Sequence, residues 1–328
     1  MAVLVTGGAG YIGSHMAYAL ADRHEKVVVI DNLTTGLRPL VCESSTFVKG
    51  DVGDKTVIRE ILRKYEIDTV MHFAASTSVP ESVSHPLLYY ANNSANTLAL
   101  VQSCVEEDVQ TFVFSSTAAV YGAPHVNPVN EAATLHPISP YGRSKVMAEW
   151  ILRDAALAHP FRYVALRYFN VAGADPAGRT GQSTPQASHL VKKACQVALG
   201  RFSQLEIFGM DYPTPDGTGE RDYIHVSDLV SAHLAALDHL RNGGESTVLN
   251  CGYGHGTSVR EIIRAVEQIS GRKIRTVERE RRLGDPARVV ADSTQIRKKF
   301  GWIPQYDDVM ELVRSAYVWE CRLADLGL

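Results

Sequence analysis

Residues 3–16 of the chain read VLVTGGAGYIGSHM, and this stretch decides the fold. The apolar run 3–5 is typical of a short buried strand, and apolar residues recur at helical spacing after the glycines. Gly7, Gly10 and Gly13 allow a tight turn and let the backbone approach a pyrophosphate at the N-terminus of the helix. Strand, glycine-rich turn and helix in this order predict a dinucleotide-binding site at the start of a parallel α/β sheet.

The residue that ends the second expected strand indicates which dinucleotide binds. Residues 27–30 read VVVI and lead directly into Asp31. A carboxylate at this position accepts hydrogen bonds from the adenosine ribose hydroxyls and repels a 2′-phosphate. We therefore predict NAD as the cofactor rather than NADP.

Strand and helix patterns alternate through residue 170, which predicts a doubly wound parallel sheet of the Rossmann type over residues 1–170. A smaller C-terminal substrate-binding lobe is expected over residues 171–328, with some segments crossing back to the first domain. The expected strands are 2–6, 26–31, 46–49, 69–73, 111–115 and 163–168, and the expected helices are 11–22, 54–65, 92–107 and 142–157.

Three features are expected after residue 170. Residues 173–188 are rich in Gly, Pro, Ser and Thr and are expected to form a loop that carries binding contacts. Residues 258–261 form a capping box, with Gly271 as the C-terminal stop of that helix. Apolar residues at helical spacing predict a further helix over 308–323.

Composition narrows the class of protein. Hydrophobic residues make up 45% and charged residues 21% of the 328 residues, as in ordinary globular proteins. The net charge of −3 gives no electrostatic support for nucleic-acid or membrane-surface binding. Five cysteines without CxxC spacing fit reduced thiols in the cytoplasm, and the histidines show no metal-ligand spacing. The first expected strand starts too early to leave room for a signal peptide.

A candidate catalytic pair lies at 141 and 145. Tyr141 and Lys145 share one face of a helix, and we expect the lysine ammonium to lower the pKa of the phenol. The pair could then take a proton from an alcohol as a hydride leaves the same carbon. Thr117 follows the apolar run 111–114 and would place its hydroxyl at the carboxyl end of that strand. A Tyr-x-x-x-Lys spacing also occurs on ordinary helix surfaces, so this prediction depends on the cofactor site.

Together these motifs resemble the extended short-chain dehydrogenase/reductase family, and most closely its UDP-glucose 4-epimerases. The resemblance covers nearly the whole chain. It is carried by residues 7–15, Asp31-Asn32-Leu33, His72-Phe73-Ala74-Ala75, Tyr141-Gly142-x-x-Lys145, Arg167–Asn170, Arg221–Val226 and Arg282-x-Gly284-Asp285. It implies NAD-dependent 4-epimerisation of a UDP-hexose through a transient 4-keto sugar, in a homodimer that packs through helices 92–107 and 142–157.

The same resemblance implies three sets of site residues. The catalytic set is Thr117, Tyr141 and Lys145. The cofactor would be contacted by Tyr141, Lys145, Gly7, Gly10, Tyr11, Ile12, Gly13, Asp31, Asn32, Asp51, Val52, Phe73, Ala74, Ala75, Asn92 and Phe169. The UDP-sugar would be contacted by Thr117, Tyr141, Asn170, His189, Leu190, Glu206, Ile207, Phe208, Arg221, Arg282, Asp285 and Val289, with the two arginines on the diphosphate and Asp285 on the uridine ribose.

Departures from the family pattern refine the expected reaction. Thr77 stands where many epimerases carry a cofactor-binding lysine, so NAD is expected to be held less tightly. Ala118 and Ala119 stand where related dehydratases carry the acid that protonates a leaving hydroxyl, which disfavours elimination. Val289 replaces a large aromatic residue of some members and leaves room for an N-acetyl group.

Two alternatives remain beside the UDP-hexose reading. One is an enzyme for another nucleotide sugar, such as a UDP-xylose/UDP-arabinose or UDP-glucuronate 4-epimerase or a decarboxylase. A carboxylate substrate would call for an extra cation at the sugar end, and the sequence does not indicate one. The other is a non-catalytic NAD-sensing protein, against which the retained Tyr141–Lys145 pair argues.

Overall fold

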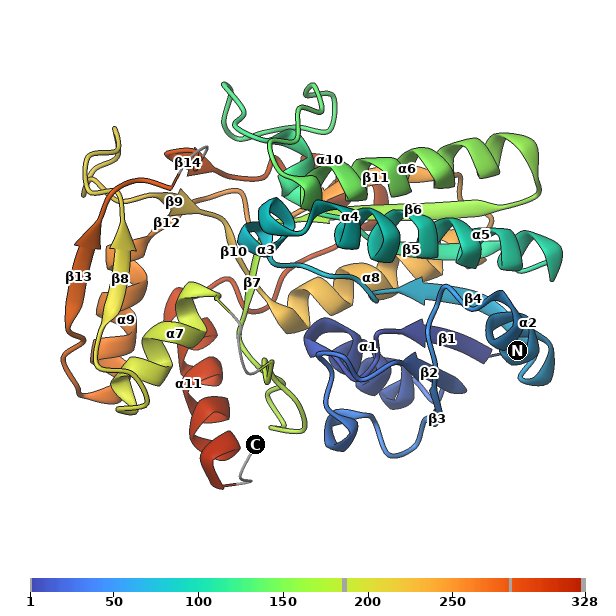
Figure 1. The fold of residues 1–328 in the computed structure, drawn as a ribbon, viewed down its shortest axis with the longest axis horizontal. Coiled ribbons are helices and arrows are strands. Elements are labelled where there is room, and N and C mark those ends of the chain that lie inside the picture. Colours follow the sequence, from blue (N-terminus) through green and yellow to red (C-terminus); the bar gives the residue numbers. More distant parts are fainter. Residues whose placement is uncertain (1, 185–187, 283–284, 326–328) are drawn as a thin grey trace.

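The computed structural model describes residues 2–184, 188–282 and 285–325 (Figure 1). Residues 185–187 of the expected loop and Gly284 of the expected Arg282-x-Gly284-Asp285 motif lie outside the described residues. None of the helices in the described ranges combines the length and hydropathy needed to cross a bilayer.

A seven-stranded parallel sheet forms the centre of the larger lobe. Its strand order is β11-β6-β5-β4-β1-β2-β3. The strands are β1 Ala2–Thr6, β2 Val27–Asp31, β3 Thr46–Lys49, β4 Ile67–His72, β5 Thr111–Ser115, β6 Arg162–Tyr168 and β11 Thr247–Cys251. The doubly wound fold is therefore confirmed, and the six strands expected before residue 170 lie within two residues of their predicted bounds. The seventh strand, β11, comes from the C-terminal half of the chain.

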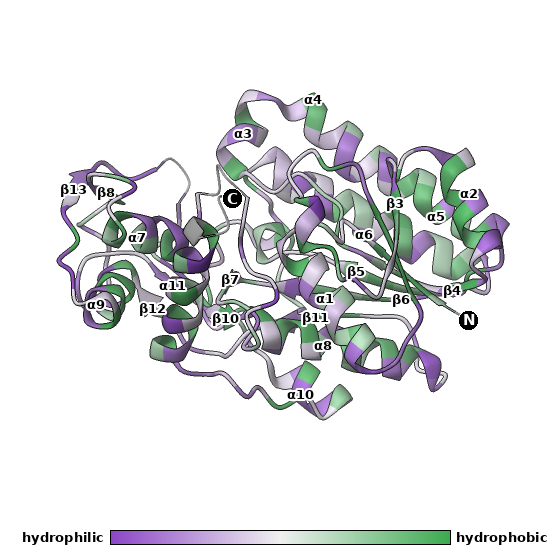
Figure 2. Ribbon diagram, turned by 90° about the horizontal axis from the view of Figure 1, so that it is seen from below, coloured by the Kyte–Doolittle hydropathy of each residue, from purple (hydrophilic) through white to green (hydrophobic). Residues whose placement is uncertain are grey.

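Helices cover both faces of this sheet because successive strand residues point to opposite sides. Val3 and Val5 face a core shared with α1 Tyr11–Asp22 and α8 Val226–Arg241, beside the short α10 Thr294–Phe300. Leu4 faces the opposite core, shared with α2 Lys55–Lys64, α5 Asn96–Glu106 and α6 Pro140–Ala158. Figure 2 shows hydrophobic colour along the strands of the sheet between these two helix layers.

The helix expected at 92–107 has a different course. After α3 Val79–Ser84, α4 Pro86–Tyr89 runs through a π-helical turn at Tyr90–Ala95 into α5. The sequence pattern missed this first part because the four residues of α4 are too few to show a helical period. Leu87 is 79% exposed and Leu88 is 51% exposed, while Tyr89 is buried. π-helical turns within α-helices occur frequently at functional sites.

The smaller lobe combines short strands with α7 Leu190–Ala198, α9 Val259–Ser270 and α11 Val309–Asp325. Its strand pairs are β7 with β10, β8 with β13, and a three-stranded group of β9, β12 and β14. The bounds are β7 Asn170–Ala172, β8 Leu205–Phe208, β9 Glu220–Arg221, β10 Tyr223–His225, β12 Thr257–Ser258, β13 Thr276–Arg279 and β14 Arg288–Val289. The predicted capping box at Ser258 and Glu261 is confirmed, and Gly271 ends α9 in the left-handed conformation at φ +67°.

Candidate active site

The glycine-rich turn joins β1 to α1 and packs against the end of β4. Gly7 has φ +68°, and a Cβ there would lie 2.7 Å from the amide N of Ala74. A Cβ on Gly13 would lie 2.2 Å from the carbonyl O of Gly7, so close packing of helix on turn requires glycine. Helix α1 begins after Gly10 without a capping side chain and without an acid in its first turn. Its N-terminal amides are thus well suited to a diphosphate, and the turn fits the expected NAD.

Asp31 closes the adenosine side of this turn. Its carboxylate accepts hydrogen bonds from the amide N of Ala9 at 3.0 Å and of Leu33 at 2.8 Å. Burial raises the pKa of Asp31, while these two hydrogen bonds oppose the rise. Asn32 donates to Asp51 at 3.0 Å, so the expected adenosine contacts at the ends of β2 and β3 lie together.

The end of β4 lies opposite the glycine-rich turn. The amide groups of Phe73 and Ala74 donate to the Thr6 hydroxyl at 3.2 and 3.3 Å, which ties β4 to β1. Asn92 lies in the π-helical turn and donates to the Ser76 hydroxyl at 3.1 Å. The expected cofactor contacts from β1, β4 and the π-helical turn are therefore brought to one edge of the sheet.

The three candidate catalytic residues meet where β5 ends and α6 begins. Tyr141 is 7% exposed and Lys145 is 3% exposed, one helical turn apart on α6. Lys145 Nζ donates to the carbonyl O of Ser115 at 2.9 Å and lies 4.8 Å from the ring centroid of Phe114. The Thr117 hydroxyl accepts a hydrogen bond from the amide N of Ala119 at 3.1 Å and so caps the short 3₁₀ helix that follows β5. It also lies close enough to the Tyr141 phenol to influence its titration.

The expected effect of Lys145 on Tyr141 is wrong for this arrangement. Burial raises the pKa of Tyr141, and the contribution that opposes the rise is the hydrogen bond with Thr117. Burial also lowers the pKa of Lys145 to about 7, with Glu149 acting in the opposite direction. The ammonium of Lys145 is directed at the Ser115 carbonyl, which explains why it contributes little to the titration of the phenol.

Charged residues from distant segments meet on the smaller lobe. Arg221 on β9 forms an ion pair with Asp285, 64 positions away, rather than with its neighbour Asp222. Asp222 is buried and accepts backbone hydrogen bonds, so its role in the structure is different. The Arg282 guanidinium lies 3.9 Å from the ring centroid of Phe208 on β8. Two arginines and a carboxylate thus gather where the nucleotide diphosphate and ribose are expected.

Val289 lies between this cluster and the catalytic residues. It pairs in register with Arg221 and is 8% exposed. It packs in one apolar cluster with Ala118, Tyr121 and Phe169, and Ala118 directly follows Thr117. Asn170 follows Phe169 in the chain and is the first residue of β7.

The remaining expected substrate contacts differ in their surroundings. Glu206 forms an exposed ion pair with Arg279 at 2.9 Å, and Ile207 points into the lobe core at 5% exposure. Adjacent strand residues face opposite sides, so these two side chains cannot line one surface. Leu190 begins α7 and packs against the same lobe core.

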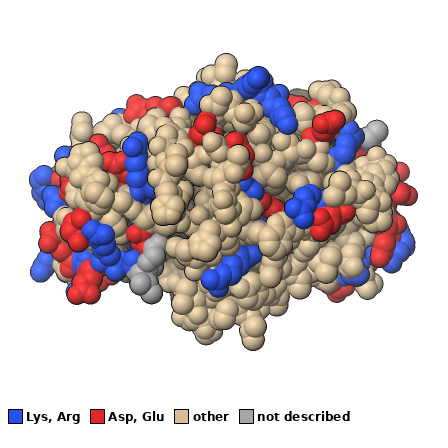
Figure 3. Space-filling view, turned by 90° about the horizontal axis from the view of Figure 1, so that it is seen from above, with Lys and Arg blue, Asp and Glu red and all other residues tan. Residues whose placement is uncertain are grey.

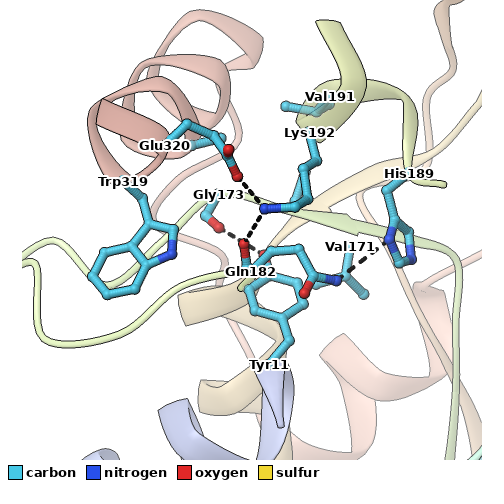
Figure 4. Close-up of a pocket in the computed structure, with 11 residues that line it drawn as sticks. Tyr11, Val171, Gly173, Gln182, His189, Val191, Lys192, Trp319 and Glu320 are labelled. Carbon is cyan, nitrogen blue, oxygen red and sulfur yellow. Dashed lines mark hydrogen bonds and ion pairs between the residues drawn. The ribbon is translucent and has the colours of Figure 1, made fainter. Parts of the chain in front are cut away.

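His189 lies beside a small cavity at the junction of the two lobes (Figure 4). Tyr11 enters this cavity from α1 and donates its hydroxyl to the carbonyl O of Gly173 at 2.7 Å. From the other lobe, Lys192 Nζ donates to the carbonyl O of Gln182 at 2.7 Å. Residues from the first turn of α1 and from the segment that leads to His189 therefore line the same cavity.

Sequence reasoning missed Glu149, which lies one helical turn beyond Lys145 and is 4% exposed. A carboxylate on the buried side of a catalytic helix, four residues after the lysine, is the signal that could have identified it.

On the outer surface, acidic and basic side chains are interspersed over the face shown in Figure 3, in keeping with the net charge of −3.

Comparisons with known proteins agree with this geometry. The model of the NAD dependent epimerase/dehydratase family matches residues 3–252. The chain is 55% identical to UDP-glucose 4-epimerase of Azospirillum brasilense, over 98% of this chain and 92% of that protein. The crystal structure of UDP-glucose 4-epimerase from Brucella ovis in complex with NAD superposes with a TM-score of 0.94 at 44% identity, over 96% of this chain and 97% of that one.

A second solved structure bears on the sugar. The UDP-Glc/GlcNAc 4-epimerase from Campylobacter jejuni superposes with a TM-score of 0.86 at 44% identity, over 98% of this chain and 99% of that one. The family model, the sequence relative and both structures are all of epimerases. The chain belongs to the NAD dependent epimerase/dehydratase family, and within that family it is similar to the UDP-glucose 4-epimerases.

Proposed function

We propose that the chain catalyses NAD-dependent 4-epimerisation of a UDP-hexose and interconverts UDP-glucose and UDP-galactose. The observation that carries this proposal is the buried group of Thr117, Tyr141 and Lys145 at the edge of the sheet that also holds the glycine-rich turn. Two relatives that match nearly the whole chain are named UDP-glucose 4-epimerase.

Residues 1–170 form the NAD-binding domain in this proposal, completed by α8 and β11, and the rest of 171–328 forms the UDP-sugar-binding lobe. When bound, NAD would supply reversible hydride transfer at C4 of the sugar. The glycine-rich turn would hold its diphosphate and Asp31 its adenosine ribose.

Tyr141 accepts the proton of the sugar 4-hydroxyl and returns it after the sugar has turned over. The Thr117 hydroxyl lies beside the phenol and opposes the rise of its pKa. Lys145 is held by the Ser115 carbonyl, one helical turn from Tyr141 on α6. No acid stands beside Thr117, because the next two residues are Ala118 and Ala119, so the site supports oxidation and reduction at C4 without elimination.

Arg221 and Arg282 hold the diphosphate while the sugar turns, and Asp285 holds the uridine ribose. Guanidinium groups match phosphate oxygens in a bidentate manner, which suits an anchor that must persist while the other end of the ligand reorients. Because Arg221 already pairs with Asp285, these two groups are brought together before substrate arrives.

The test incubates purified protein with UDP-galactose, with and without added NAD, and resolves the product sugars. We expect UDP-glucose without net NADH. Tyr141→Phe should lower kcat by about 10²–10⁴-fold, the usual contribution of a general base, and near-normal turnover of this variant would refute the assignment. If UDP-galactose gave no product, the UDP-pentose and UDP-uronate substrates would be tested next. If these also gave no product, an NAD-sensing protein would become the favoured alternative.

N-acetylated sugars are a proposed second pair of substrates. Val289 is smaller than an aromatic residue and packs beside Ala118 and Phe169 near the catalytic group. The relative from Campylobacter jejuni carries both sugars in its name. Val289→Tyr should lower the activity on UDP-GalNAc relative to UDP-galactose by about tenfold or more, within the range for steric exclusion from a pocket. Val289→Leu is the matched control, and an unchanged ratio in Val289→Tyr would contradict the steric argument.

We also infer a homodimer that works in the cytoplasm in galactose metabolism. Trp150 is 49% exposed, Met147 is 41% exposed and Leu98 is 42% exposed, on the neighbouring helices α6 and α5. Exposed apolar residues grouped in this way mark an interaction face. All five cysteines are free thiols, which suits a reducing compartment. Trp150→Glu should convert a dimer to a monomer in light scattering.

A further inference from the structure

The proposed catalytic groups come from two separate segments of the chain. The end of β5 supplies the Thr117 hydroxyl and the Ser115 carbonyl, whereas α6 supplies Tyr141 and Lys145. A shift of α6 along β5 would change both the spacing between the Thr117 and Tyr141 side chains and the Lys145–Ser115 hydrogen bond. A misplacement of about 1 Å can cost about 10²-fold in rate. The position of α6 against β5 is therefore a requirement of the reaction.

A buried carboxylate joins these two segments. Glu149 lies on α6 one turn after Lys145, and its Oε1 accepts a hydrogen bond from the Ser116 hydroxyl at 2.5 Å. Ser116 is 0% exposed and stands between Ser115 and Thr117 in the chain. The contact therefore lies between the two residues of the β5 end that touch the catalytic side chains.

Arg167 on the adjacent strand β6 fixes the orientation of Glu149. Its Nε donates to Oε1 at 3.0 Å and its Nη2 donates to Oε2 at 2.6 Å, with side chains only 6% and 5% exposed. Arg167 Nη1 donates to the Tyr121 hydroxyl at 2.9 Å, and that hydroxyl donates to Asn250 at 2.7 Å on the edge strand β11. Both carboxylate oxygens of Glu149 are hydrogen-bonded, so it cannot rotate away from Ser116 without breaking a buried network.

Stability alone gives a weak reason for such a network. A buried ion pair loses solvation on both partners, and apolar residues of similar volume often serve folding equally well. A directional contact can instead fix the relative position of two segments, because a hydrogen bond weakens steeply as its angle and distance change.

We propose that Glu149 is a positioning residue, which holds the end of β5 against α6 through Ser116 and so sets the geometry among Thr117, Tyr141 and Lys145. Glu149 does not touch the expected substrate, and it acts through the residues that do. The inference rests on the proposed epimerase function and adds a determinant of its rate.

The first test removes only the hydroxyl that joins the segments. Ser116→Ala leaves the Glu149–Arg167 ion pair intact, and Ser103→Ala is the matched control, since its equally buried hydroxyl donates to the carbonyl O of Ala99 within α5. We expect Ser116→Ala to lower kcat for UDP-galactose by about tenfold or more with KM changed by less than about twofold, because the anchoring arginines are untouched. Ser103→Ala should retain the wild-type kcat.

The second test separates position from folding. Glu149→Leu combined with Arg167→Met removes both charges and leaves neither one buried and unpaired. A variant that keeps the wild-type Tm and KM but loses at least about tenfold in kcat supports the proposal. Wild-type kcat in this double variant, or equal kcat in Ser116→Ala and Ser103→Ala, overturns it. Failure of the wild-type protein to act on any UDP-sugar would instead overturn the proposed function, and the positioning role with it.

Discussion

The ion pair between Lys192 on α7 and Glu320 on α11 supports a quantitative prediction (Figure 4). The Lys192 side chain is 5% exposed and the Glu320 side chain is 2% exposed. The second oxygen of Glu320 accepts from Arg201 at 3.3 Å. Among the described residues, Glu320→Leu would leave Lys192 charged and buried with the Gln182 carbonyl as its one remaining hydrogen-bond partner.

The magnitude follows from the burial. Removing one partner of a buried pair costs about 3–5 kcal/mol, whereas removing both often costs little. With about 2.1 cal/mol/K of unfolding entropy per residue, a chain of 328 residues has an unfolding entropy of about 0.7 kcal/mol/K. Glu320→Leu should therefore lower Tm by about 4–7 °C, and Lys192→Met combined with Glu320→Leu should recover more than half of that loss.

Scanning calorimetry without ligand measures these shifts. The control is Asp238→Asn, which breaks the exposed pair with Arg23, whose side chains are 37% and 46% exposed. An exposed pair contributes less than about 1 kcal/mol, so the control should move Tm by no more than about 1.5 °C. Equal shifts for Glu320→Leu and the control, or a double variant less stable than the single one, would refute the reasoning.

Three further predictions concern the site, the pH dependence and a helix end. Arg221→Leu should raise KM for UDP-galactose by about tenfold or more because a charged diphosphate contact is lost. Steady-state kinetics test this, and Arg281→Leu at an exposed arginine is the control. An equal rise of KM in both variants would contradict the anchoring role of Arg221. Burial lowers the pKa of His233 from 6.5 to about 4, so its contribution to stability is present above pH 6.5 and is lost as pH falls toward 4. In urea titrations at pH 5 and 7, His233→Gln should flatten this decline by up to about 1.4 kcal/mol per pH unit, and an unchanged slope would count against it. Gly271→Ala should cost about 1–2 kcal/mol because φ is +67°, while Gly271→Asn should cost less; equal losses in thermal melts would be the contrary result.

Sequence reasoning succeeded where the signal lies within about one turn or one strand. The capping box at Ser258 and Glu261 needs four residues, and the glycine-rich turn needs seven. Each works through backbone geometry that neighbouring residues determine. The positions of the first six strands along the chain followed from the same kind of local pattern.

Long-range features were out of reach for a physical reason. The pairing of Arg221 with Asp285 depends on β9 and β14 meeting in space, and no local pattern indicates that contact. The direction of the Tyr141 pKa shift depends on burial by surrounding elements, which helical spacing to Lys145 does not encode. Helix α4 escaped because its four residues are too few to show a helical period, and only Tyr89 among them is buried.

The position of β11 has a consequence for synthesis of the chain on the ribosome. β11 pairs only with β6, as the outermost strand of the sheet, and its last residue, Cys251, follows far behind Tyr168 at the end of β6. At a synthesis rate of about 5–20 residues per second, β11 is completed roughly 4–17 seconds after β6. Throughout that interval the nascent chain presents an unpaired strand edge, the kind of surface that recruits other chains. Yield in cells should therefore depend on chaperone capacity and translation speed between these two strands.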